Sequence, residues 1–174
     1  MHRSFRALVL ASVAAAAAAS AQVVIPDVTA DWKEADAPPP PALRTQGLIP
    51  IEVAGASLRF GVDPASITVG KDGVVRYVVV ATSSSGAVNA LYEGIRCGTG
   101  EVKVYGRHTP GSGWVPAPDA NWQALRSVAN SRHSLAIARN GACMEQAPNG
   151  SPVQIAQDLR ATVDRRFERG GVNR

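Results

Sequence analysis

The sequence predicts an α+β domain, mostly β, in which an antiparallel meander sheet is packed by a C-terminal helix. Residues 74–82, VVRYVVVAT, are rich in β-branched side chains, which suit strands. The connections between the expected strands are short turns, too short for the helical crossovers that parallel strands need. One amphipathic stretch with a helix-start signal follows near the C-terminus. We expect about five or six strands, an ordinary sheet size.

The first residues have the pattern of a secretory signal peptide, residues 1–21. Arg3 and Arg6 precede an apolar run over residues 7–19, which leads into a small-x-small cleavage site. The run is shorter than the roughly 20 apolar residues that a membrane-spanning helix needs. We therefore expect an exported protein, periplasmic or secreted, that starts at Gln22 after cleavage and keeps no transmembrane segment.

Residues 22–46 are expected to be a proline-rich tether. Pro38 to Pro41 are consecutive, and proline favours an extended polyproline II conformation. Residues 47–170 have the length of a single globular domain. The formal net charge is +4, and part of it leaves with the signal peptide. An exported, nearly neutral domain is not expected to bind nucleic acid.

The first half of the domain shows the alternation of half-buried strands. Residues 48–53 alternate weakly, and residues 57–62, SLRFGV, place Leu, Phe and Val on one face. A short strand is expected over residues 66–69, followed by a turn over residues 70–73. Asp-Gly in that turn is a strong hairpin signal.

The central strands follow. Residues 74–82 are apolar on both faces except at Arg76, which predicts a central strand. Residues 87–97 form the next strand, and Gly94 inside it suggests a bulge. Residues 101–106 return, after a glycine turn, as its antiparallel neighbour.

The second half is less regular until the last helix. We expect a short helix over residues 121–128, capped by Asn121, and a short strand over residues 133–138. Ser151 can cap a helix whose first residue is proline. An apolar stripe with a four-residue spacing predicts that this helix docks on the sheet and ends at Gly170-Gly171. The stripe consists of Ile155, Leu159, Val163 and Phe167.

Cys97 and Cys143 are the two cysteines of the chain. In an exported protein such a pair indicates one disulfide. The alternative, a reactive thiol, requires a neighbouring histidine and a site that favours the thiolate. The expected disulfide ties the strand that ends near Cys97 to the segment before the last helix.

No motif of the sequence assigns a catalytic residue, a cofactor or a metal. His108 and His133 lack the spacing of a helical zinc pair, and the glycine turns match neither phosphate-binding fingerprint. Glu93 is expected to pair with Arg76 or Arg96 on the sheet. The alternative is a hydrolase of envelope material that uses Glu93 with Glu101 or Asp72 as paired carboxylates.

Three residues are candidates for a binding surface: Trp114, Glu93 and Arg96. Trp114 lies in a glycine- and proline-rich loop, and tryptophan is a common anchor at interfaces. The same side chain can instead cover the open end of the sheet. The partner is expected to be either an envelope protein or a small ligand.

The segments VDPASITVGKDGVVRY and YEGIRC, with a proline-rich stretch before them and a second cysteine after them, resemble the cryptic neisserial protein-like family of exported bacterial proteins. The resemblance implies an exported domain with paired cysteines and supplies no catalytic residues. We expect a non-catalytic binding or interaction module of the cell envelope, not an enzyme. The alternatives are the envelope hydrolase and a purely structural envelope component.

Overall fold

The computed structural model of this chain describes residues 31–126 and 132–162, and Lys33 begins the compact unit that carries the fold. Strands form one antiparallel sheet of eight and one of two within these ranges. The strands are β1 (Ile49–Ile51), β2 (Arg59–Val62), β3 (Thr68–Val69), β4 (Val74–Thr82), β5 (Val88–Arg96), β6 (Glu101–Thr109), β7 (Gly113–Pro116), β8 (Gln123–Ala124), β9 (Cys143–Met144) and β10 (Ala147–Pro148). The helices are α1 (Arg132–Ile137) and α2 (Pro152–Arg160).

The large sheet is an antiparallel meander, as predicted. Its strands follow the order β1-β2-β4-β5-β6-β7, with β3 beside β4 and β8 beside β6. The short turns that join these strands leave no room for crossovers. The expected fold class, mostly β with a C-terminal helix on the sheet, is therefore confirmed. The large sheet has more strands than the five or six expected, because β7 and β8 form in a region that was predicted to be loop and helix.

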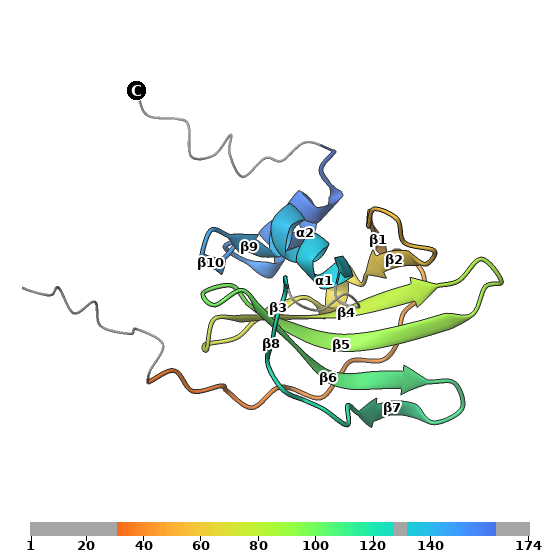
Figure 1. The fold of residues 1–174 in the computed structure, drawn as a ribbon, viewed down its shortest axis with the longest axis horizontal. Coiled ribbons are helices and arrows are strands. Elements are labelled where there is room, and N and C mark those ends of the chain that lie inside the picture. Colours follow the sequence, from red (N-terminus) through yellow and green to blue (C-terminus); the bar gives the residue numbers. More distant parts are fainter. Residues whose placement is uncertain (1–30, 127–131, 163–174) are drawn as a thin grey trace, which may run out of the picture. The chain divides into compact units, whose positions relative to one another are not determined.

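The two faces of the sheet bury different partners (Figure 1). On one face, Val75, Tyr77 and Val79 pack with Ile137 of α1 and Ile155 of α2. The other face has a smaller buried cluster around Val78, Val80, Ala90 and Tyr92. Leu43 and Leu48, from the segment before β1, cover part of this second cluster. Both faces of β4 are thus buried, which explains why its sequence lacks alternation.

Residues 133–138 and 121–128 differ from their predictions. The first segment is helix α1, continued by a π-helical turn over Ala138–Ala142. Burial of His133, Ser134 and Ile137 against the sheet suits a helical period, and tertiary contacts override the weak local strand preference. Gln123–Ala124 form β8 on β6 in place of the expected helix. Residues 127–131 lie outside the described residues.

Helix α2 begins as predicted and ends earlier. The Ser151 side chain accepts a hydrogen bond from the Gln154 amide, and proline occupies the first turn. Ile155 and Leu159 are buried against the core. The helix stops at Arg160, because Ala161 is extended. Val163 and Phe167, the rest of the predicted stripe, lie outside the described residues.

The bulge in the central hairpin has a different position from the predicted one. The register between β5 and β6 shifts between Tyr92 and Glu93, which leaves Tyr105 as the extra residue. Gly94 is not the bulged residue, but it lies against the side chain of that residue, Tyr105. A Cβ at Gly94 would lie 2.8 Å from atoms of the Tyr105 ring. The glycine therefore provides the space into which the Tyr105 ring packs.

Candidate functional site

The segment that precedes β1 lies along the second face of the sheet, where aromatic side chains of β5, β6 and β7 gather. In Figure 1 it is the orange stretch of chain. From Ala37 onward its burial repeats with a period of three, since Ala37, Pro40 and Leu43 are half-buried; Glu34 and Ala35, which precede them, are both half-buried. Pro38, Pro39, Pro41 and Ala42, between these positions, are exposed. A polyproline II helix has about three residues per turn and so presents one side at this spacing. The burial pattern is thus that of a polyproline II helix lying with one edge on the sheet.

Glu34 fixes the first turn of this segment. Its carboxylate accepts hydrogen bonds from Lys103 Nζ at 2.9 Å, from the Tyr105 hydroxyl at 2.8 Å and from Trp122 Nε1 at 3.0 Å. Burial opposes ionisation of Glu34, but these donors outweigh it and lower its pKa. Burial also raises the pKa of Tyr105, so this hydroxyl keeps its proton and acts as a donor.

A buried ion pair holds the next residue. Arg76 Nη2 lies 2.7 Å from Asp72 Oδ2 and also donates to the Ala35 carbonyl at 3.2 Å. The Ala35 amide in turn donates to Asp72 Oδ2 at 3.0 Å. Burial opposes ionisation of Asp72, but the hydrogen bonds from Arg76, Ala35 and Val74 outweigh it and lower its pKa to about 2. Ala35 is therefore locked to the sheet through both of its backbone polar groups.

Trp114 fixes the far end of the proline run. Its indole Nε1 donates a hydrogen bond to the Pro41 carbonyl at 2.8 Å, and its ring meets His108 edge-on at 5.3 Å. Tyr92 and Tyr105 lie between the two anchors, with ring centroids 5.4 Å apart. A hollow of about 280 Å³ remains between these aromatic side chains and the residues from Ala37 to Pro40. We call the surface formed by Tyr92, Tyr105 and Trp114 the aromatic groove.

Glu93 lies on the opposite face of the sheet, buried to 1% exposure. Its carboxylate oxygens lie 2.9 Å from His133 Nε2, 2.9 Å from the Tyr77 hydroxyl and 3.0 Å from Ser134 Oγ. The predicted pairing of Glu93 with Arg76 or Arg96 is wrong. Helix α1 brings its own partners to this carboxylate. The burial of Tyr77 and the charge of Glu93 raise the pKa of the Tyr77 hydroxyl.

The carboxylates of the proposed hydrolase are not brought together. Glu93 is paired in register with Val104, whereas Glu101 lies opposite Arg96 with 3.5 Å between their charged atoms. Asp72 is engaged by Arg76 and Ala35 on the second face. The contacts of the three predicted binding residues lead to different partners: Arg96 lies near Glu101, Glu93 bonds to Tyr77, His133 and Ser134, and Trp114 bonds to Pro41.

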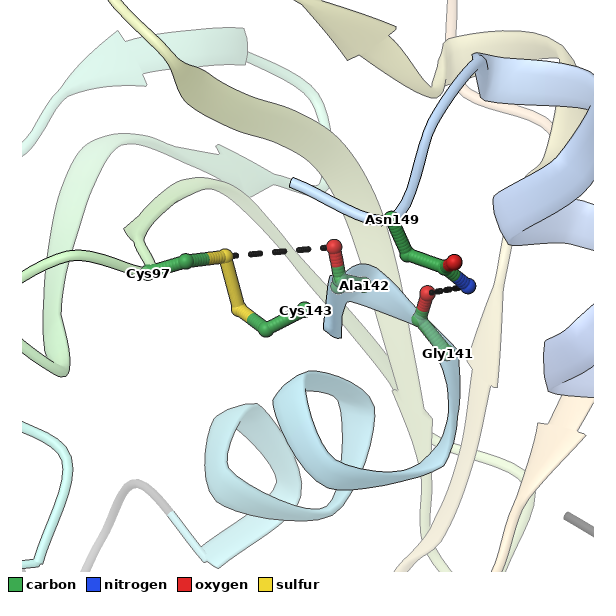
Figure 2. Close-up of a disulfide and its surroundings, with 5 residues drawn as sticks. All are labelled: Cys97, Gly141, Ala142, Cys143 and Asn149. Atoms are coloured by element: carbon green, nitrogen blue, oxygen red, sulfur yellow. Dashed lines mark hydrogen bonds between the residues drawn. A yellow bond between two sulfur atoms is a disulfide. The ribbon is translucent and has the colours of Figure 1, made fainter. Parts of the chain in front are cut away.

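The predicted disulfide between Cys97 and Cys143 is confirmed, with Cα atoms 5.6 Å apart (Figure 2). The Sγ of Cys97 lies 3.9 Å from the Ala142 carbonyl oxygen. A half-cystine has no hydrogen to donate, so this approach is a packing contact. Beside it, Asn149 donates from its amide to the Gly141 carbonyl at 2.9 Å. The disulfide joins the residue that follows β5 to the first residue of β9.

A hollow of about 610 Å³ lies beside this disulfide, the largest of those described. Leu125, Leu135 and Ala138 supply apolar lining, and Arg126, Asn140 and Glu145 supply exposed polar lining. Among the residues that the structure describes, no group of three or more His, Cys, Asp or Glu side chains is arranged to hold a metal ion.

Sequence reasoning found Trp114 and missed its partners. Trp114 lies on β7, not in a loop, and it is half-buried. Tyr92, Tyr105 and Glu34 were not predicted to form a site. A signal for them was present in the four prolines, which predict polyproline II structure, and in aromatic residues on consecutive strands. The bulge at Tyr105 shifts the alternation of β6 by one residue. The alternation of the sequence therefore did not show that Tyr105 lies on the same face as Tyr92.

Comparison with known proteins identifies the family. The CNP1-like family model matches residues 27–160. The chain belongs to the CNP1-like family. The match includes the segment from Glu34 to Leu43 as well as the sheet. No curated protein and no solved structure matches the chain. Within residues 31–126 and 132–162, no helix is long and apolar enough to cross a membrane.

Proposed function

We propose that this CNP1-like protein is an exported component of the cell envelope, periplasmic or secreted, that acts as a non-catalytic interaction module. The signal-peptide pattern over residues 1–21 and the disulfide between Cys97 and Cys143 support export, since disulfides persist in oxidising compartments. The module contacts its partner, an envelope protein, through the aromatic groove.

The observation that carries this proposal is the hydrogen bond from Trp114 to the Pro41 carbonyl, made across a row of aromatic side chains. Aromatic grooves with a tryptophan donor are a general means of recognising extended, proline-rich chains. In this chain the groove extends over β5, β6 and β7, and β7 is the last strand of the sheet order. Pro116, two residues after Trp114 and therefore on the same face of β7, is exposed and lines the hollow.

The two alternatives have less support. The hydrolase requires neighbouring carboxylates in a cleft, and Glu93 is instead saturated by hydrogen-bond partners on the helical face. A structural component that assembles through a broad apolar patch is not favoured either. The exposed large apolar side chains of the described residues come from four separate segments: Leu58, Val115, Met144 and Val153.

Site-specific photo-crosslinking in cells that export the protein tests the proposal. A photoreactive residue replaces Pro116 in one variant and the exposed Leu58 in a matched control. We expect a discrete crosslinked product from position 116 that is absent from position 58 and is lost when Trp114→Ala is added. Equal products from both positions, or none from position 116, would contradict the interaction module. Mass spectrometry of the purified protein tests export, for which the expected N-terminus is Gln22.

A further inference from the structure

The polyproline segment of this chain occupies the aromatic groove as an intramolecular ligand. We propose that the groove is a binding site for a polyproline II segment of a partner polypeptide, which displaces the chain's own Ala37–Leu43 stretch. This inference rests on the proposed function, because it names the chemistry of the partner that the groove would bind.

The spacing of the contacts defines what the groove selects. Ala37, Pro40 and Leu43 face the sheet, three residues apart, while the residues between them are exposed. Leu43 packs against the cluster that contains Tyr92, and Pro40 lines the hollow beside Tyr105. A ligand therefore needs an apolar side chain at every third position and an extended backbone that presents a carbonyl to Trp114. A polyproline II helix supplies both without internal hydrogen bonds.

The resident segment is held firmly at one end and loosely along the groove. Glu34 and Ala35 make hydrogen bonds and ion pairs that no proline-rich ligand needs to break. Among the described residues, those from Asp36 to Pro40 make no hydrogen bond, and the next polar contact is the bond from Trp114 to Pro41. Exchange of the proline run thus breaks one hydrogen bond, which an incoming carbonyl restores.

The fit of the resident segment is incomplete. The hollow of about 280 Å³ between the prolines and the aromatic side chains is lined by Tyr92, Tyr105, Trp114 and Pro116 together with Ala37 to Pro40. The hollow is partly open to solvent, so side chains of a ligand can enter it. A partner with bulkier side chains at the facing positions would fill this space and gain contacts that the resident segment lacks.

The tethered segment also weakens every ligand that binds in trans. A segment joined to its own site has a high effective concentration, so the groove is free in only a fraction of molecules. If that fraction is about one in ten, the apparent affinity for a partner falls about tenfold. A variant whose resident segment is released should therefore bind a proline-rich peptide more tightly than the natural chain.

The test uses the whole protein and a fluorescent peptide with the sequence of residues 33–44, KEADAPPPPALR. The released variant carries Pro40→Ser and Leu43→Ser, two facing positions. Its matched control carries Pro39→Ser and Ala42→Ser, two exposed positions that remove the same number of prolines. Fluorescence anisotropy should show the released variant binding about tenfold more tightly than the natural chain. The matched control should behave like the natural chain.

The peptide is varied in the same way. Substitution of its facing residues, Pro40 and Leu43, should abolish binding, whereas substitution of Pro39 and Ala42 should leave most of it. Adding Trp114→Ala to the released variant should weaken binding about tenfold or more, as expected at an aromatic hot spot. The inference is overturned if the released variant does not bind the peptide. It is also overturned if facing and exposed substitutions have equal effects.

Two further measurements keep the outcome interpretable. Circular dichroism reports whether the released variant folds, and Pro40→Ser alone offers a second released variant that keeps the contact of Leu43 with the sheet. Crosslinking from position 116 without peptide binding would support the interaction module and reject the polyproline partner. Peptide binding without any crosslink in cells would retain the groove chemistry and reject the proposed function.

Discussion

The Asp72–Arg76 pair should make the stability of this protein sensitive to acid in a defined range. The Asp72 side chain is 1% exposed and that of Arg76 is 2% exposed, with 2.7 Å between their nearest charged atoms. The pKa of Asp72 falls from 3.8 to about 2. Each pKa unit corresponds to about 1.4 kcal/mol, so the difference contributes about 2 kcal/mol to the free energy of unfolding. Because the pKa is lowered on folding, this contribution is present above about pH 4 and is lost as the pH falls toward 2.

The assay is urea unfolding of the natural chain and of Asp72→Asn, followed by tryptophan fluorescence from about pH 6 to about pH 2. At about pH 6 the variant should be less stable by about 3 to 5 kcal/mol, since Arg76 keeps its charge in a buried position. The difference in free energy of unfolding between the natural chain and the variant should decrease by about 2 kcal/mol as the pH falls. Asp119→Asn, at an exposed position, is the control. It should leave the dependence of the unfolding free energy on pH unchanged. The reasoning would be refuted if the difference in free energy of unfolding between Asp72→Asn and the natural chain stayed constant with pH.

Three further predictions concern the core and the disulfide. Gly94→Ala should destabilise the protein by about 1–3 kcal/mol through overpacking against Tyr105, and chemical denaturation measures the loss. Glu93→Ala leaves three buried polar partners without their acceptor and should cost about 3–5 kcal/mol; an unchanged melting temperature would show that the cluster is dispensable. Replacing Cys97 and Cys143 together by serine opens a loop with a sequence separation of 46, and the loss in unfolding free energy should be about 4 kcal/mol. Reduction of the natural chain should approach the same value, and a double variant as stable as the oxidised protein would contradict it.

The sheet was predictable because its signals are local. Residues 74–82 and 87–97 combine β-branched side chains with adjacent turns, and β4 and β5 form there within one residue of the expected bounds. The start of α2 was predictable for the same reason, since Ser151 and Pro152 act within one turn. Helix α1 was not predictable in this way. His133 and Ser134 are placed by hydrogen bonds to Glu93, some 40 residues away along the chain.

In the candidate site, too, some features follow from local sequence patterns and others depend on residues far apart in the chain. Trp114 was singled out because it lies in a glycine- and proline-rich stretch, where burial is not guaranteed, and because tryptophan is a common anchor at interfaces. Its partner Pro41 is separated from it by 73 positions, and no local pattern joins the two. The proline run was expected to hold the domain away from its N-terminus, whereas residues 34–43 lie along the sheet. Glu34 decides this arrangement through three donors on β6 and the segment after β7.

The sequence by itself determined the family, the mostly β class, the meander order and the pairing of the two cysteines. Each of these follows from short-range patterns, or from a pair of residues that has only one way to combine. Only the tertiary structure decided which face each charged side chain occupies and what covers the second face of the sheet. The physical reason is that a buried charge takes whichever partner the fold brings within hydrogen-bonding distance. For Glu93 that partner set is Tyr77, His133 and Ser134, and for Arg76 it is Asp72 with the Ala35 carbonyl.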